Sequence, residues 1–336
     1  LGYTNVVSLT FFSGISGSAL ADAAGPGSML IRMMDKAGYD RAYAAALTAS
    51  TAIVGPIIPP SIIMIVYGVA ADVSIAQLFI AGVLPGLLLA GLFSGYIIFW
   101  SLRHPDQIPP RDAPMSFMQK IQASSSLIPV VLLIAAVLGS IYTGFATATE
   151  AAAVGVVGSL VLSTLQGSMS WSVFKEALMG ATRLYCMIAL ILAGAAFLTL
   201  SMGYIGLPRH LAEWIGGLGL SPFALVMALM VFFIILGCFL DGISMVVLTM
   251  GVLMPTVQKA GIDPIWFGIF IVLVVEMAQI TPPVGFNLFV LQGMTGKQLT
   301  YIARVSMPMF FLMMGAVLLI YFVPGIVTWL PTQMKL

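Results

Sequence analysis

Long apolar stretches, separated by short polar ones, make up most of the chain. Uninterrupted stretches occupy residues 77–100, 123–143, 147–166, 183–204 and 303–330. A helix needs about 20 predominantly apolar residues to cross a bilayer. Each of these stretches is about that long or forms most of such a run with its flanks. The pattern therefore predicts an all-α polytopic membrane protein.

Four further apolar stretches are interrupted by glycine, serine, threonine and proline. They cover residues 4–33, 41–71, 222–257 and 265–292. Proline removes a backbone donor and glycine permits tight turns, so we expect the helix to break inside each stretch. The first and third are predicted to be re-entrant helical hairpins, and the second and fourth to be broken helices. The interruptions fall at Ser13–Gly17 and Gly25–Gly27, at Gly55–Ser61, near Gly237–Gly242, and at Thr281–Gly285.

The distribution of positive charge supports this interpretation. Cytoplasmic loops of membrane proteins are enriched in lysine and arginine. If both hairpins return to the side from which they entered, ten of the 13 lysines and arginines fall on one side, which we therefore assign to the cytoplasm. The other side holds Arg209, Lys259 and Lys335. The ten are Arg32, Lys36, Arg41, Arg103, Arg111, Lys120, Lys175, Arg183, Lys297 and Arg304.

The two halves of the chain echo one another in the same order but with opposite predicted orientation. Gly14-Ile15-Ser16 recurs as Gly242-Ile243-Ser244, and Pro59-Pro60 recurs as Pro282-Pro283. In both halves the second proline of the pair is followed by another proline 25 residues later. Inverted repeats with broken helices are typical of secondary transporters.

The predicted repeats divide the chain into three parts. The first repeat covers residues 1–100, a polar cytoplasmic connecting loop with four prolines covers 101–122, and the second repeat covers 123–336. Residues 168–180 are expected to lie in the membrane interface, apart from the span that follows them. The second repeat is predicted to hold scaffold helices at 123–204, a hairpin at 222–257, a broken helix at 265–292 and a last span at 303–330.

Composition agrees with a membrane protein. The 336 residues are 60% hydrophobic and 7% charged, whereas soluble domains carry roughly 25% charged residues. The net charge of +1 gives no indication of nucleic-acid binding. Cys186 and Cys238 lie in apolar runs and are expected to be buried thiols, with no metal-binding Cys/His spacing nearby. The chain begins at Leu1 and has no signal-peptide pattern, so we expect it to be part of a longer protein.

The interrupted segments supply oxygen ligands at membrane depth. Unpaired backbone groups are tolerated there only where they face a cavity or bind an ion. Hydroxyls and freed carbonyls of residues 12–18 and 55–61 are hard ligands suited to Na⁺, so we predict one Na⁺ site between them. The mirror segments, 237–244 and 278–285, predict a second site by symmetry. Alternatively, the small residues only permit close helix packing.

An anionic substrate is expected between the hairpin tips, where helix N-termini present free N–H groups. Polar candidates for its contacts are Ser18, Ser61, Ser244 and Asn287. The alternative for these four is hydrogen bonding between helices.

Ionisable residues at membrane depth are costly to bury and are therefore candidates for a functional role. Asp22 and Asp241 either bind a cation or cap a broken helix, and the sequence leaves both possibilities open. Glu276 belongs to the same group, whereas Glu150 follows a short turn and is expected to reach the interface.

Two other classes of protein are disfavoured. Gly14-Ile15-Ser16-Gly17 also fits the Gly-x-Ser-Gly pattern of intramembrane serine proteases, but such an enzyme needs a base beside the serine. His104 and His210 are the only histidines, and neither lies inside a span. A channel would need a continuous pore, which inverted halves do not favour.

These motifs resemble those of the large membrane (M) subunit of tripartite ATP-independent periplasmic (TRAP) transporters, over essentially the whole chain. They are residues 11–22 (FFSGISGSALAD), 55–61 (GPIIPPS) and 281–285 (TPPVG). The resemblance implies an elevator-type carrier of the ion transporter superfamily in the bacterial inner membrane. It also implies Na⁺-driven symport of carboxylates such as C4-dicarboxylates or sialic acid, with a small membrane (Q) subunit and a periplasmic binding protein as partners. The alternative is a stand-alone Na⁺/dicarboxylate symporter.

Carried over by motif, the resemblance implies two sets of Na⁺ ligands. The second hairpin lacks the Ser-x-x-Ser pair of the first, and the family's upstream scaffold helices are expected to be missing from this chain. The first set is Ser13, Ser16, Gly55, Ile58 and Pro59, and the second is Gly237, Ala278, Thr281 and Val284.

Overall fold

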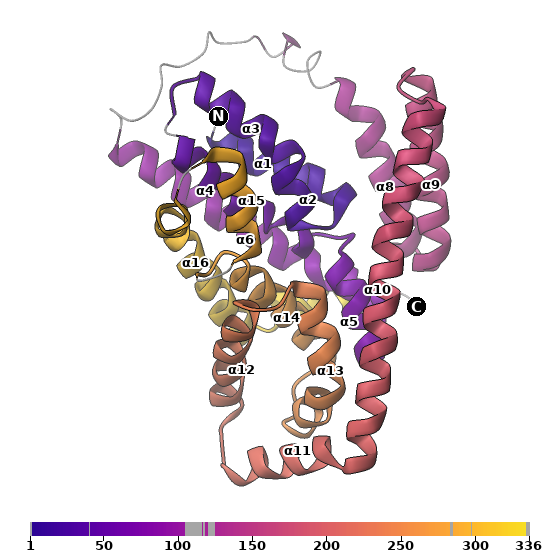
Figure 1. Ribbon diagram of the computed structural model, residues 1–336, viewed down its shortest axis with the longest axis vertical. Coiled ribbons are helices and arrows are strands. Elements are labelled where there is room, and N and C mark those ends of the chain that lie inside the picture. The colour runs from indigo at the N-terminus through magenta and orange to yellow at the C-terminus, as the bar shows by residue number, and fades with distance from the viewer. Residues whose placement is uncertain are drawn as a thin grey trace. The chain divides into compact units, whose positions relative to one another are not determined.

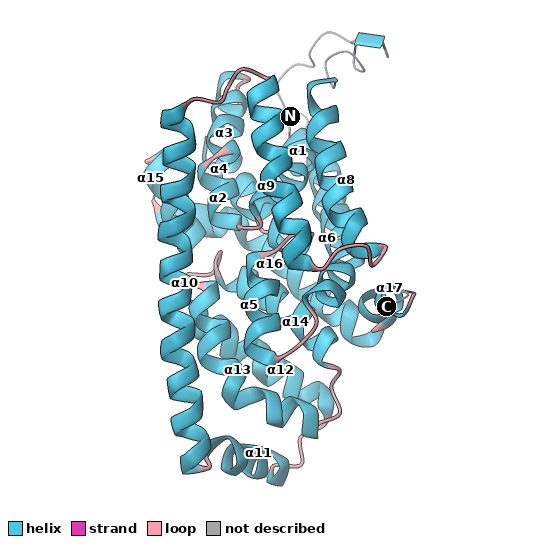
Figure 2. Ribbon diagram, turned by 90° about the vertical axis from the view of Figure 1, so that its right-hand side faces the viewer, coloured by secondary structure: helices cyan, strands magenta, loops and turns pink. Residues whose placement is uncertain are grey.

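The protein is helical throughout the part that the computed structural model describes, and no strand occurs there (Figures 1 and 2). This confirms the prediction of an all-α chain. The described residues are 2–39, 41–104, 116, 118–119, 125–282, 285–296 and 298–333.

The chain divides into two compact units. The first combines Leu1–Pro109 with Leu192–Gln333, and the second combines Pro110–Ile191 with Met334–Leu336. The first unit contains all four interrupted segments. This division follows compactness and cuts across the predicted repeats, whose boundaries stay a prediction.

The first interrupted segment folds back on itself. Helix α1 (Gly2–Ser16) ends at Gly17, and α2 (Ala19–Ala24) and α3 (Pro26–Lys36) then pack against α1. Gly17 has φ of +60°, a conformation that favours glycine because it has no Cβ. Pro26 begins α3, where its missing N–H costs no helical hydrogen bond.

The second interrupted segment is a bent helix pair. Helix α4 (Arg41–Ala52) leads through a 3₁₀ turn at Gly55–Ile57 to α5 (Ile62–Ala71). The two parts are bent by 44°. The bend coincides with the proline pair, because neither proline can continue the backbone hydrogen bonds of a helix. Helix α6 (Ile75–Arg103) follows.

The other half repeats this order. Helices α12 (Pro222–Gly237) and α13 (Gly242–Lys259) form a second hairpin. Helix α14 (Pro264–Ala278) and helix α15 (Phe286–Thr295) then flank a second break. The remaining helices of this unit are α11 (Leu207–Gly217), α16 (Leu299–Phe322) and α17 (Gly325–Thr332).

The two hairpins open toward opposite ends of the first unit. The end of α3 lies beside Trp100 and Arg304, whereas Lys259, at the end of α13, lies beside Arg209 on α11. Figures 1 and 2 show α3 and α11 at these opposite ends. The hairpins therefore have the inverted orientation that the charge pattern predicted.

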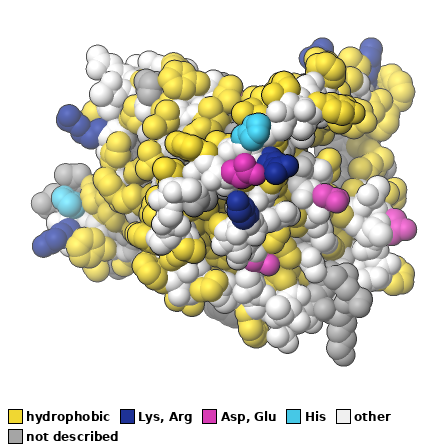
Figure 3. Space-filling view, turned by 90° about the horizontal axis from the view of Figure 1, so that it is seen from below, with side chains coloured by type: hydrophobic (Ala, Val, Ile, Leu, Met, Phe, Trp, Pro, Cys, Tyr) yellow, Lys and Arg dark blue, Asp and Glu magenta, His cyan; other side chains and the backbone are white. Residues whose placement is uncertain are grey.

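Five described helices are long and apolar enough to cross a membrane, and the bent pair α4–α5 makes a sixth. The five are α6, α9 (Ala148–Leu165), α10 (Trp171–Ile205), α13 and α16. Figure 3 views the molecule from the end at which α11 lies in Figure 1, where charged side chains gather in small groups among hydrophobic ones. Large hydrophobic side chains are exposed along α9 and α10, as expected of helices that face lipid.

The second unit contains α8 (Ile128–Tyr142), α9 and the first part of α10. Helix α10 is one continuous helix of 35 residues, so residues 171–180 continue directly into the predicted span at 183–204, and their place in the membrane interface stays a prediction. Gly180 is the only glycine near the expected junction and no proline is present, so the helix continues. Cys186 on α10 is exposed, contrary to expectation, whereas Cys238 is buried, and both are free thiols.

A buried polar pair joins the first hairpin to the first broken helix. The Thr51 hydroxyl donates to Asn5 Oδ1 at 2.7 Å, and Asn5 Nδ2 donates to Thr48 Oγ1 at 2.9 Å. All three side chains are fully buried. Hydrogen bonds between helices in a membrane contribute about 0.6–2 kcal/mol each.

Thr51→Val is therefore expected to lower the free energy of unfolding by about 0.6–2 kcal/mol, because it removes the bond between α1 and α4 and leaves Asn5 Oδ1 unsatisfied. Thr164→Val is the matched control, since that exposed hydroxyl bonds only to its own helix. Thermal unfolding in detergent measures both. Equal unfolding temperatures for the two variants would contradict a stabilising role for the Asn5–Thr51 bond.

Candidate functional site

The tip of the first hairpin contacts the break between α4 and α5. The carbonyl of Gly17 accepts a hydrogen bond from the N–H of Ile62 at 3.3 Å. A Cβ on Gly17 would lie 2.7 Å from the carbonyl oxygen of Pro60. Residue 17 must therefore be glycine both for its backbone conformation and for this close approach.

A buried carboxylate positions the serine at this tip. The Ser16 hydroxyl donates to Asp22 Oδ1 at 2.6 Å, and Ser16 Oγ accepts from the N–H of Ser18 at 3.2 Å. Asp22 is 1% exposed and lies in the first turn of α2, where the helix dipole favours negative charge. The N-cap of α2 is Ser18, so Asp22 does not cap this helix. Asp22 instead accepts a hydrogen bond from the Ser16 hydroxyl.

Some backbone carbonyl oxygens at the break between α4 and α5 are available to bind a cation. The Gly55 carbonyl accepts from the N–H of Ile58 at 3.0 Å. The carbonyls of Ile58 and Pro59 accept no backbone hydrogen bond from any described residue outside the helices. Unpaired carbonyls at membrane depth need a partner such as a cation. Ser13 lies in α1, and its side chain is outside the described part.

Two glycines of α6 allow the break between α4 and α5 to pack closely against α6. A Cβ on Gly82 would clash with the carbonyl oxygen of Ile57, and one on Gly86 would clash with the Ile58 side chain. Sequence reasoning missed these two residues, although their four-residue spacing is the signal that small residues give at close helix contacts.

The second hairpin and second break meet in the same manner. A Cβ on Gly237 would clash with the Ala278 side chain, so the two residues are in direct contact. Cys238 Sγ donates to the carbonyl of Pro282 at 3.4 Å. The Thr281 hydroxyl donates to the Met277 carbonyl at 2.8 Å, which leaves its oxygen lone pairs available. Val284 lies outside the described residues.

The two halves of the site also contact each other. A Cβ on Gly242, at the tip of the second hairpin, would lie 3.2 Å from Ile63 Cδ1 and 3.1 Å from Gln279 Nε2. Ile63 follows directly after Ile62, which bonds to the first tip. Helix α2 packs against α15, and α13 packs against α5. Both tips therefore lie against the first turn of α5.

Four helices begin at this place. Ser18 caps α2 by accepting from a backbone N–H at 3.4 Å, and Ser61 caps α5 at 3.3 Å. Asp241 caps α13 by accepting from two N–H groups at 3.1 and 3.2 Å, and it also accepts from the Ser244 hydroxyl. Gly285 begins α15 with no side-chain cap. Each helix start carries a partial positive charge. The carboxylates of Asp22 and Asp241 already lie at the starts of α2 and α13, so the starts of α5 and α15, which hold no acidic side chain, favour a further anion.

Two buried polar side chains nearby have atoms without a hydrogen-bond partner among the described residues. Both amide atoms of Asn287, in the first turn of α15, are unpaired although the residue is fully buried. Glu276 is 1% exposed; its Oε1 accepts from Gln279 Nε2 at 3.4 Å and its Oε2 is unpaired. Buried polar atoms without a partner are rare in native proteins and point to a bound group.

The arrangement does not provide the base that a serine protease needs. Ser16 bonds to a carboxylate, whereas His104 stacks on Trp100 at the end of α6 and His210 lies on α11. In the described part of the chain, neither imidazole forms a hydrogen bond to Ser16.

Comparison with protein families gives a match over residues 1–326 to the family described as "Tripartite ATP-independent periplasmic transporter, DctM component". A C4-dicarboxylate TRAP transporter large permease of Pseudomonas aeruginosa is 31% identical over 98% of this chain and 77% of its own. A sialic acid TRAP transporter large permease of Vibrio cholerae is 33% identical over 86% of this chain and 67% of its own. An isethionate TRAP transporter permease of Oleidesulfovibrio alaskensis is 32% identical over 94% of this chain and 50% of its own.

A solved structure, that of the Alcanivorax borkumensis YdaH transporter, has a similar fold. It superimposes with a TM-score of 0.64 at 15% identity, over 95% of this chain and 77% of that one. At this identity the likeness shows the fold alone.

Gly17→Ala is expected to destabilise the protein by about 1–3 kcal/mol, because a Cβ meets both an unfavourable φ and the Pro60 carbonyl. Gly91→Ala is the matched control. Gly91 lies inside α6 with no atom within 4 Å of an added Cβ, so the change is neutral or stabilising by up to about 1 kcal/mol. Thermal unfolding in detergent compares the two. A Gly17→Ala variant as stable as Gly91→Ala would show that the tip does not contact the break as described.

Proposed function

Since the chain belongs to the DctM family of tripartite ATP-independent periplasmic transporters, we propose that it is the transport subunit of a Na⁺-coupled symporter that imports a small organic acid. The observation that carries this proposal is the meeting of four helix N-termini with two interrupted backbones inside one unit. The N-termini favour the acid, and the freed oxygens favour the cation. One site thus holds both co-transported species.

The first Na⁺ is proposed to bind between Ser16 and the oxygens of the first break. Ile58 and Pro59 offer carbonyls without a backbone donor, and Gly55 lies one turn earlier. Hydroxyl and carbonyl oxygens are the ligands that hard cations prefer. Asp22 holds the Ser16 hydroxyl from the other side and adds a negative charge, which strengthens the attraction for a cation.

The second Na⁺ is proposed to bind at the mirror position. Gly237 and Ala278 are in contact there, and Thr281 offers a hydroxyl oxygen whose proton is held by its own helix. Asp241 caps α13, and its carboxylate oxygens accept hydrogen bonds from two N–H groups of that helix and from the Ser244 hydroxyl. Asp241 therefore has a structural role as a helix cap. Asp22 has no capping role, and we assign it to the first cation site.

The substrate is proposed to be a carboxylate or a similar small acid. Relatives are named for C4-dicarboxylate, sialic acid and isethionate, all of them acids. The N-termini of α5 and α15, which hold no acidic side chain, suit the shared negative group, and they do not distinguish between these acids. Asn287, with both amide atoms unpaired, is the residue proposed to recognise the substrate's polar body. Ser18 and Ser61 cap helices, and Ser244 bonds to the cap residue Asp241. The hydroxyls of these three serines are proposed as further contacts to the substrate.

The family works with a small membrane subunit and a periplasmic binding protein, and we propose the same partners here. One relative is named as a DctMQ permease, which fits a large and a small component in one protein. The exposed apolar faces of α9 and α10 suit lipid or a membrane partner. We place the protein in the bacterial inner membrane and propose that the unit with the hairpins moves as an elevator. The second candidate is a stand-alone symporter that needs no binding protein.

Uptake of labelled organic acids into proteoliposomes tests the proposal. The vesicles contain the full-length protein with its small partner subunit, with the binding protein outside and an inward Na⁺ gradient. Uptake that requires both Na⁺ and the binding protein is expected. Uptake with Na⁺ alone would favour the stand-alone symporter, and uptake unaffected by Na⁺ would contradict the coupling.

Ser16→Ala and Thr281→Ala are each expected to raise the Na⁺ concentration needed for half-maximal uptake roughly three- to tenfold, because each removes one oxygen ligand. Ser28→Ala is the matched control, since Ser28 lies on the same hairpin and bonds only to the Gly25 carbonyl. If both site variants keep the wild-type Na⁺ dependence, the assignment of the two Na⁺ sites is wrong.

Asn287→Leu, which keeps the volume but removes the amide, is expected to raise the substrate KM about tenfold or more. The Na⁺ concentration for half-maximal uptake should change far less. Dose–response curves for substrate and for Na⁺, measured on the same vesicles, separate the two effects. A normal KM in this variant would exclude Asn287 from the substrate site.

A further inference from the structure

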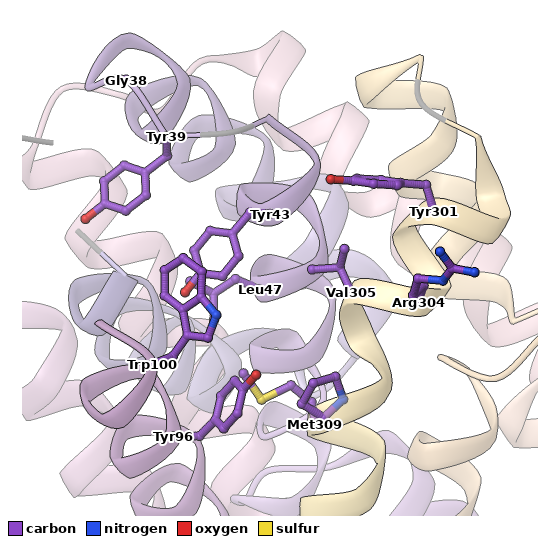
Figure 4. Close-up of a pocket in the computed structure, with 11 residues that line it drawn as sticks. Gly38, Tyr39, Tyr43, Leu47, Tyr96, Trp100, Tyr301, Arg304, Val305 and Met309 are labelled. Carbon is purple, nitrogen blue, oxygen red and sulfur yellow. The ribbon is translucent and has the colours of Figure 1, made fainter. Parts of the chain in front are cut away.

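A cavity of about 550 Å³ lies at the end of the first unit where the first hairpin opens. Four elements line it: the turn after α3, the start of α4, the last turns of α6 and the first turns of α16. Figure 4 shows Tyr39, Tyr43 and Trp100 on one side and Tyr301 and Arg304 on the other. None of its lining residues belongs to the candidate site described above.

One wall of this cavity is a stack of aromatic rings. Tyr43 and Trp100 stack with centroids 4.7 Å apart, and Tyr39 extends the stack at 6.4 Å from Tyr43. His104 continues it on the far side of Trp100 at 4.8 Å. Tyrosine and tryptophan are enriched where membrane meets water, because their rings are apolar and their edges are polar. The wall thus has the side chains that proteins place at the depth of the lipid headgroups.

The opposite wall carries a positive charge. Arg304 is the charged residue among those that line the cavity, and it forms no ion pair with any described acid. Val305 and Met309 follow it along α16 and make that wall apolar. An arginine binds phosphate through two parallel N–H···O bonds, which suits it to a phosphodiester. The cavity therefore combines an anion-binding rim with an apolar and aromatic interior.

The charge of this end of the unit agrees with an anionic ligand. Lys36 and Arg103 belong to the same set of charges that predicted the cytoplasmic side. Basic pockets between transmembrane helices on that side bind anionic lipid headgroups. A soluble anion would use Arg304 but would leave the apolar interior without a partner.

We propose that this cavity binds one anionic phospholipid, with its phosphate on Arg304 and its glycerol and upper acyl chains between the aromatic stack and α16. The proposal does not depend on the Na⁺ sites or on the transported acid. The lipid would link α4, α6 and α16 at the end where the first hairpin opens.

Trp100 provides a direct test, because a brominated lipid quenches the fluorescence of a tryptophan that it contacts. The full chain is reconstituted in phosphatidylcholine vesicles that contain the same fraction of brominated phosphatidylglycerol or brominated phosphatidylcholine. The difference between wild type and Trp100→Phe isolates the signal of Trp100. We expect brominated phosphatidylglycerol to be preferred roughly fivefold at Trp100.

Arg304→Gln is expected to abolish this preference and Arg304→Lys to keep most of it. Arg209→Gln is the matched control, because Arg209 lies on α11 at the other end and is paired with Glu213; it should leave the preference unchanged. Equal quenching by the two lipids, or a preference that survives in Arg304→Gln, would overturn the proposal. Relief of the quenching by excess glycerol phosphate would also overturn it, in favour of a soluble anion.

Discussion

The structure depends on one constraint, the need of every backbone N–H and C=O group at membrane depth to have a partner. A continuous helix meets this need by itself, but the prolines at residues 59, 60 and 282 prevent it here. The interrupted backbones therefore have to lie against hairpin tips, as Ile62 does against Gly17. The carbonyls of Ile58 and Pro59, which accept no backbone hydrogen bond from the described residues outside the helices, are the ones we propose as ligands of a cation.

Close contact between these segments requires small residues at specific positions. Gly17 approaches Pro60, Gly82 approaches Ile57, and Gly237 touches Ala278. Both hairpin tips are thereby held against the first turn of α5. On the proposed function, the same geometry would offer oxygens to a cation and N–H groups to an anion. The coupling of the two species would follow from their common binding region.

Much of this arrangement could be predicted from sequence because its causes are local. Proline and glycine mark the breaks, apolar length marks the spans, and the positive charges mark the direction of the hairpins. What could not be predicted depends on contacts between distant segments. The bond from Ser16 to Asp22 depends on the path of the turn between them, and the aromatic stack on Trp100 joins three parts of the fold.

The most direct test of Na⁺ binding is the unfolding temperature of the purified full-length protein as Na⁺ replaces K⁺ at constant ionic strength. A ligand that binds only the folded state stabilises it by about 1.4 kcal/mol for each tenfold rise in concentration above its Kd. The account predicts that Na⁺ raises the unfolding temperature and that K⁺ does not. Identical unfolding temperatures in the two ions, across the whole concentration range, would contradict it.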